Sequence, residues 1–174
     1  MNAPVKDRIE DRDIPEIVRA AVEKHGSHRD ALIPILSEIN AALGYIPAEA
    51  IKEVKRQVYN PEERTFVSEG QLFSMASFYD MLSTEPRGQH VVKFCESAPC
   101  HVVGGRQVWQ ALKDRLGLKN GQTSPDGQWS LVTTSCLGIC SVGPVLLVDD
   151  DVYGNVSPEE VEEILNRYET EGEK

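Results

Sequence analysis

The sequence predicts an α/β protein in which an N-terminal helical bundle precedes a small mixed domain. Apolar residues in the first half recur at helical spacing, whereas the second half alternates between short β-rich runs and helical stretches. The turn sequence Pro86-Arg87-Gly88 separates the two patterns. We therefore expect the helical bundle at residues 1–87 and the mixed domain at residues 88–174.

Local start and stop signals place the first three helices. The first carries an apolar stripe from Ile14 to Val22, and the second is expected to start at Ser27, with Asp30 three positions later. Gly44 follows the last apolar residue of the second helix and predicts its end. Pro47 then opens a third, shorter helix.

The fourth helix follows a predicted loop at Asn60-Pro61. It is expected to start at Ser68, where Gln71 completes a capping box. Phe78 and Tyr79 lie near its end, and we expect both rings in the hydrophobic core.

The second half alternates strands and helices. Strands are predicted at residues 90–94, 129–133, 145–148 and 152–153, and helices at residues 102–116 and from Ser157 onward. This order, β-α-β-β-β-α, is that of a small α/β domain of thioredoxin-like type. Gly104-Gly105 lies early in the first of these helices, where glycine is costly, and predicts a close approach to a neighbouring element.

The charge balance bears on partners. The chain has 28 acidic and 18 basic residues, a formal net charge of −10. Such a surface repels phosphate backbones, so nucleic acid is excluded as a partner; the charge serves either solubility or complementarity to a basic patch on a partner subunit. No apolar run is long enough to span a bilayer, and residues 1–16 lack the apolar segment of a secretory signal. The expected location is the cytoplasm, free or peripheral to a membrane complex.

The four cysteines carry the chemistry. Cys95 and Cys100 are spaced C-x4-C at the end of a predicted strand and just before a predicted helix, and Cys136 and Cys140 are spaced C-x3-C in one loop. Clustered cysteines in a cytosolic protein indicate metal or redox chemistry rather than structural disulfides. Two close pairs suit a [2Fe–2S] cluster, which takes two thiolates on each iron. His101 adjoins a ligand, but with four thiolates available we expect it beside the cluster or at the surface rather than on a metal.

Two alternatives stay open at this point. A structural zinc site on the same four cysteines would make the chain an interaction module, although such sites usually use tighter C-x2-C spacing. Thiol–disulfide exchange would require a C-x-x-C motif, which the sequence lacks. Gly138 and Gly143 lie in the loop of the second pair; they either make the turn or allow backbone N–H groups to approach sulfur.

The runs FCESAPCHVVGG and TTSCLGICSVGPVLLVDDDVYGNVSPEEV resemble the thioredoxin-like [2Fe–2S] ferredoxin family. That family includes the NuoE-like peripheral subunit of NADH dehydrogenase (complex I) and related subunits of NAD-linked hydrogenases and formate dehydrogenases. ILSEINAALGYIPAEAI and SMASFYDML match in the helical half, whereas the connection RQVYNPEERTFVSEGQLF is longer than is usual in the family.

The resemblance implies cluster ligation by Cys95, Cys100, Cys136 and Cys140 and no catalytic residue on this chain. It also implies docking to a flavoprotein subunit that binds FMN and NAD(H), with further iron–sulfur subunits in the complex. The sequence has no G-x-G-x-x-G fingerprint, in keeping with a nucleotide site on the partner.

Overall fold

The computed structural model describes residues 13–59 and 67–171, and the chain divides into two compact units, residues 5–86 and residues 87–174. The loop predicted at Asn60-Pro61 and the expectation for residues 1–12 lie outside the described residues. No described helix is both long and apolar enough to cross a membrane.

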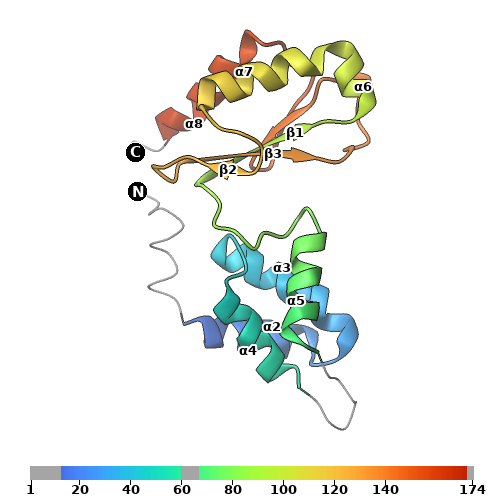
Figure 1. Cartoon of the computed structure of the whole chain (residues 1–174), viewed down its shortest axis with the longest axis vertical. Coiled ribbons are helices and arrows are strands. Elements are labelled where there is room, and N and C mark those ends of the chain that lie inside the picture. Colours follow the sequence, from blue (N-terminus) through green and yellow to red (C-terminus); the bar gives the residue numbers. More distant parts are fainter. Residues whose placement is uncertain (1–12, 60–66, 172–174) are drawn as a thin grey trace. The chain divides into compact units, whose positions relative to one another are not determined.

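The first unit is helical (Figure 1). Its elements are α2 (Ile14–His25), a short 3-10 turn η1 (Arg29–Ala31), α3 (Leu32–Leu43), α4 (Ala48–Gln57) and α5 (Glu69–Phe78). The stop at Gly44 is confirmed: its φ is 81°, and its N–H donates to the Asn40 carbonyl. The start expected at Ser27 is wrong, because the chain first winds the tight turn η1, which begins after His28, before α3 begins at Leu32.

Helix α5 shows both a success and a failure of prediction. The capping box is present: the Ser68 side chain accepts from the Gln71 N–H, and the Gln71 side chain accepts from the Ser68 N–H. The expected burial of Phe78 and Tyr79 is wrong, since they are 76% and 39% exposed. Phe78 lies about 200° around the helix from Ala76 and so on the opposite face, and Tyr79 leaves the buried face because α5 ends at Phe78 and the backbone of Tyr79 is extended.

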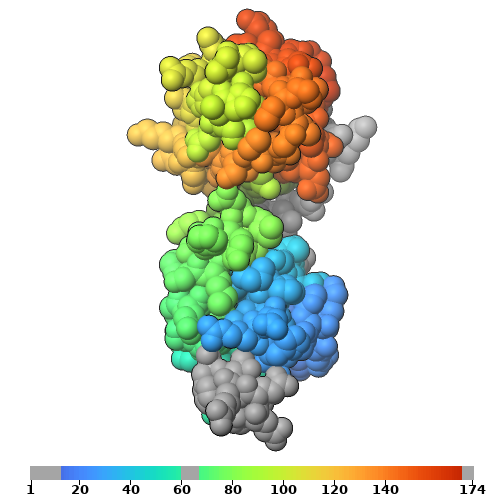
Figure 2. Space-filling model, turned by 90° about the vertical axis from the view of Figure 1, so that its right-hand side faces the viewer, coloured from blue at the N-terminus to red at the C-terminus, as the bar shows by residue number. Residues whose placement is uncertain are grey.

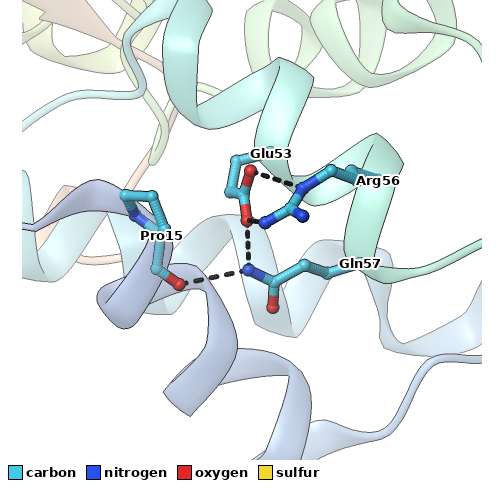
Figure 3. A network of polar contacts seen from close by, with 4 residues as sticks. All are labelled: Pro15, Glu53, Arg56 and Gln57. Atoms are coloured by element: carbon cyan, nitrogen blue, oxygen red, sulfur yellow. Dashed lines mark hydrogen bonds and ion pairs between the residues drawn. The ribbon is translucent and has the colours of Figure 1, made fainter.

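One continuous core holds the helices of this unit together. Its fully buried members include Val18, Leu32, Ile35, Leu36, Ile39, Ile46, Val54 and Leu72. Gln57 also joins α4 to α2 through a hydrogen bond of 3.1 Å from its Nε2 to the Pro15 carbonyl, with Glu53 and Arg56 beside it (Figure 3).

The second unit contains a five-stranded sheet in the order β2-β3-β1-β4-β5. The strands are β1 (His90–Cys95), β2 (Gln122–Thr123), β3 (Trp129–Thr134), β4 (Leu146–Val148) and β5 (Asp151–Tyr153). Strand β1 pairs in parallel with β3, with Cys95 opposite Thr134, and antiparallel with β4. The sequence did not predict β2, because a two-residue strand within turn-forming residues exists only through its pairing with β3.

The connection between β1 and β3 begins earlier than predicted. A first turn, α6 (Ala98–Cys100), continues through a kinked turn, η2 (His101–Gly105), into α7 (Arg106–Leu116). The kink occurs at Gly104, whose φ of 109° is a backbone conformation that glycine adopts readily. The predicted close approach is confirmed at Gly105: a Cβ there would lie 2.6 Å from the Cys100 carbonyl oxygen.

Helix α7 and the C-terminal helix α8 (Glu160–Glu171) lie on one face of the sheet (Figure 1). Their apolar side chains form one core with Val92, Phe94, Leu131 and Leu146 from the strands. The predicted start signal of α8 is present in part: the Glu160 carboxylate accepts the Ser157 N–H at 2.8 Å. The first two cysteines lie where β1 ends and α6 begins: Cys95 is the last residue of β1, and Cys100 is the last residue of α6.

Candidate metal centre

Cys95 and Cys100 form a buried pair. Cys95 ends β1 and is 2% exposed, and Cys100 ends α6 and is 1% exposed. Cys100 therefore lies within the first helical turn, not just before a helix as the sequence suggested. A hydrogen bond joins the two thiols. The chain from β1 through α6, residues 95–100, therefore brings both sulfurs together.

Cys136 and Cys140 form an exposed pair in the loop after β3. Their Sγ atoms lie 3.6 Å apart. Two thiolates on one tetrahedral metal, with metal–sulfur bonds of about 2.3 Å, lie about 3.8 Å apart. The sulfurs of this pair thus have the separation expected for two ligands of one metal ion.

The fold brings the two pairs together. The Leu137 N–H, from the loop of the second pair, donates to the Cys95 sulfur. A Cβ on Gly143, from the same loop, would lie 3.4 Å from the Cys100 sulfur. Within the described residues, no three side chains of the ligand types His, Cys, Asp and Glu group around one point as ligands of a single ion do. The sulfurs are arranged as two neighbouring pairs.

Backbone N–H groups and neighbouring thiols set the acidity of these sulfurs. Burial alone would raise the pKa of Cys95, but hydrogen bonds from Ser97, Cys100 and Leu137 outweigh it, and the pKa lies below its ordinary value. Burial and then the hydrogen bond to Cys95 raise the pKa of Cys100. The hydrogen bond shared with Cys136, followed by burial, raises the pKa of Cys140.

Gly138 serves both of the purposes weighed for it. Its φ of 81° turns the loop between the two exposed cysteines, and its N–H lies 3.4 Å from the Cys136 sulfur. Nothing lies within 4 Å of the position that its Cβ would take, so glycine is required by backbone conformation rather than by crowding.

The two segments that carry Cys100, Cys136 and Cys140 also carry exposed apolar side chains, which sequence reasoning did not single out. Val102 is 85% exposed and Val103 55%, and Leu137, Ile139 and Val142 are each more than one-third exposed. We call these five residues the apolar rim. The two segments that supply it lie side by side, yellow-green and orange, in Figure 2. A signal was available: no charged residue occurs between Glu96 and Arg106 or between Asp126 and Asp149, in a chain that is 26% charged.

His101 directly follows Cys100 in the chain and precedes Val102. Its residue is partly buried, and its Nδ1 is buried without a hydrogen-bond partner. The candidate site thus contains four free cysteines, two buried and two exposed, and backbone N–H groups that donate to their sulfurs. The apolar rim and the unpaired Nδ1 of His101 belong to the same two segments.

Two neighbouring pairs of thiols lie at the edge of a mixed sheet, and the chemistry of this donor set fits iron or zinc. Comparison with known families decides which class this is. Residues 18–169 match the model of the thioredoxin-like [2Fe–2S] ferredoxin family, and the chain belongs to that family.

Relatives of full length support the assignment. The chain is 34% identical over 160 residues to the NuoE subunit of NADH-quinone oxidoreductase from Aquifex aeolicus, covering 90% of this chain and 96% of the relative. It is 29% identical over 157 residues to the HndA subunit of NADP-reducing hydrogenase from Solidesulfovibrio fructosivorans, covering 90% and 85%.

A solved structure supports the fold alone. A chain of an NAD+-reducing [NiFe]-hydrogenase in the H2-reduced state superposes with a TM-score of 0.63 at 17% identity. The match covers 78% of this chain but only 22% of that longer chain.

Proposed function

We propose that the chain holds one [2Fe–2S] cluster on Cys95, Cys100, Cys136 and Cys140 and acts as an electron-transfer subunit without catalytic residues of its own. The carrying observation is the arrangement of the four sulfurs as two neighbouring pairs, in a member of a [2Fe–2S] family. When bound, such a cluster supplies one-electron transfer, and two thiolates on each iron match the two pairs.

The protein's own groups have separable tasks in this proposal. Cys95 and Cys100 anchor the inner side of the site, because both are almost fully buried. Cys136 and Cys140 hold the outer side, at the surface where a redox partner can approach. The N–H groups of Leu137 and Gly138 donate to the sulfurs and offset the negative charge of a thiolate site.

We further infer that the chain works in an NAD(H)-dependent oxidoreductase complex with a flavoprotein subunit that carries FMN and binds NAD(H), and with further iron–sulfur subunits. Two of its relatives are named as subunits of NADH-quinone oxidoreductase and of NADP-reducing hydrogenase. A nicotinamide hydride carries two electrons, so a flavin must separate them before a one-electron centre can accept them. The chain would lie on the cytoplasmic side, peripheral to any membrane part of the complex.

Exposed apolar side chains of the helical unit are the proposed docking surface for that flavoprotein. On and just after α5, Phe73 is 52% exposed, Phe78 76% and Met81 67%. Exposed aromatic and methionine side chains of this kind are enriched at protein interfaces. This unit has no cysteine, which leaves association rather than electron transfer as its task.

Single-cysteine variants test the cluster assignment. Replacing any one of the four cysteines with alanine leaves one iron short of a thiolate, so cluster content should fall sharply, with serine the milder change because its oxygen can bind iron. His101→Ala, next to a ligand, is the control and should keep its cluster. A cysteine variant that retains full iron and sulfide content would remove that residue from the ligand set.

Surface variants of the full chain test the docking proposal. Phe78→Ser should weaken co-purification with the flavoprotein while leaving the visible spectrum of the cluster unchanged. Val152→Ser is the matched control, because Val152 is also an exposed apolar side chain, at 55%, but lies in the other unit. Equal co-purification of the Phe78 variant and the wild type would place the docking surface elsewhere.

A further inference from the structure

The exposed thiols Cys136 and Cys140 lie close enough together to react with each other. Their Sγ atoms are 3.6 Å apart, and both residues are exposed. A disulfide has an S–S separation of about 2 Å, so the two sulfurs need to approach by about 1.5 Å. Rotation about the Cα–Cβ bond of an exposed side chain moves its sulfur while the backbone stays in place. The pair that is spaced for one metal ion is therefore also spaced for a covalent bond.

The loop between these cysteines leaves room for that approach. It lies between the end of β3 and the start of η3 (Cys140–Val142), outside the strands of the sheet. Gly138 stands between the two cysteines, and nothing lies within 4 Å of the position that its Cβ would take. Its N–H donates to the Cys136 sulfur at 3.4 Å rather than to a carbonyl. Closing a disulfide here breaks no hydrogen bond between strands.

Exposure separates this pair from the other one. A hydrogen bond also joins the thiols of Cys95 and Cys100, but these residues are 2% and 1% exposed. Oxidation of a thiol by a molecule in solution requires that the molecule reach the sulfur. An oxidant can therefore reach the exposed pair, while the buried pair stays reduced.

We propose that Cys136 and Cys140 form a reversible disulfide in the chain without its cluster, and that this bond prevents cluster binding. The oxidant is a small disulfide of the glutathione class. One protein thiolate attacks it and releases the first small thiol, and the second protein thiolate then displaces the other small thiol and closes the bond. The two protein thiols lose two electrons and two protons, and the oxidant becomes two small thiols.

The bond would act as a redox switch on cluster assembly. A [2Fe–2S] cluster takes two thiolates on each iron, and the disulfide leaves only the two thiols of the buried pair. This consequence rests on the proposed function, whereas formation of the disulfide does not. Exposed disulfides are the labile ones, so a cellular dithiol can reopen the site, and the bond keeps the outer sulfurs from irreversible oxidation to sulfinic and sulfonic acids.

Peptide mapping tests the bond, because trypsin separates the two pairs. Residues 94–106 carry the buried pair and residues 120–167 carry the exposed pair. The reduced, cluster-free full-length chain is treated with oxidised glutathione, alkylated in denaturant and digested. We expect two alkyl groups on peptide 94–106, and none on peptide 120–167, which should have lost two hydrogens. Two alkyl groups or a retained glutathione on peptide 120–167 would overturn the proposal, as would a link between the peptides.

Two single variants test the pairing. In Cys136→Ser, the Cys140 thiol has no partner to displace the small thiol, so it should retain one glutathione. Cys95→Ser is the matched control, because it removes a thiol of the buried pair, and it should still close the disulfide in peptide 120–167. Loss of that disulfide in the Cys95 variant would refute the assigned pair.

Cluster uptake tests the consequence. The reduced and the oxidised full-length chains each receive ferrous iron without oxygen, with sulfide kept at a concentration at which peptide mapping finds the disulfide intact. The visible spectrum should show uptake by the reduced chain alone, and dithiothreitol should restore uptake by the oxidised chain. Equal uptake by both chains would overturn the switch. A reduced chain that takes up no cluster would refute the proposed function and the switch together, while the mapped disulfide would stand.

Discussion

Gly105→Ala is the substitution that the structure predicts most sharply. Gly105 lies in the helical segment after Cys100, with ordinary helical φ and ψ of −59° and −27°. Alanine would therefore gain about 1 kcal/mol of intrinsic helix propensity at this position. Its Cβ, however, would lie 2.6 Å from the Cys100 carbonyl oxygen and 3.1 Å from the Phe94 ring, and the first of these is a backbone atom that cannot rotate away.

Overpacking of this kind costs about 1–3 kcal/mol, and the clash with backbone places the cost at the upper end. After the propensity gain, the net loss is about 1–2 kcal/mol, which lowers the ratio of folded to unfolded protein about 5- to 30-fold. With a urea dependence of about 2 kcal/mol per M, the unfolding midpoint should fall by about 0.5–1 M. Cluster retention should fall as well, because relief of the clash moves the backbone of Cys100.

Tryptophan fluorescence is the assay, because both tryptophans of the chain, Trp109 and Trp129, lie in the unit that contains Gly105. Gly70→Ala is the matched control: Gly70 is also helical, and a Cβ there meets only the Ser68 hydroxyl at 3.9 Å. It should leave the fluorescence transition unchanged and slightly raise the stability of the helical unit. A Gly105→Ala protein with an unchanged midpoint and full iron content would refute the reasoning.

Three further predictions address single interactions. Ser68→Ala removes the cap of α5 and should cost the helical unit about 1 kcal/mol in thermal unfolding followed by far-UV circular dichroism, whereas Ser68→Asp should keep most of the stability. The hydrogen bonds from His25 and then Lys24 hold the pKa of Glu38 below its ordinary value of 4.5, so the stability that Glu38 contributes is present above that pH and is lost as the pH falls through the lowered pKa. Glu38→Gln should flatten that acid-side loss in pH-dependent unfolding, and an unchanged pH profile would show that the pair does not contribute. Gly138→Ala should strain the loop by about 1–2 kcal/mol, because of its φ of 81°, and should speed loss of iron to a chelator; a wild-type rate would argue against that strain.

Local signals made parts of the fold predictable from sequence. The capping box at Ser68 and the helix stop at Gly44 depend on residues within one turn of each other, and both are present. Helical spacing also indicates the exposure of Phe78, because this residue lies opposite the face of Leu72 and Ala76, whereas the exposure of Tyr79 depends on α5 ending one residue earlier. Strand β2 was missed for a related reason: two residues form a strand only where another strand is available to pair with them.

The candidate site shows the same division. Spacing alone singled out the four cysteines, since a cluster needs close pairs. Which pair is buried depends on tertiary structure: Cys95 and Cys100 are covered where β1 meets α6, while the loop of Cys136 and Cys140 stays at the surface. The unsatisfied Nδ1 of His101 was beyond the reach of the sequence, because it depends on every atom packed around one ring.

Metal and sulfide analysis of the purified full-length chain tests the central claim most directly. Protein made with ample iron and purified without oxygen should contain about two irons and about two acid-labile sulfides per chain, as a single [2Fe–2S] cluster requires. It should be red-brown. One zinc per chain with no labile sulfide, in colourless protein from the same preparation, would contradict the account and make the four cysteines a structural zinc site.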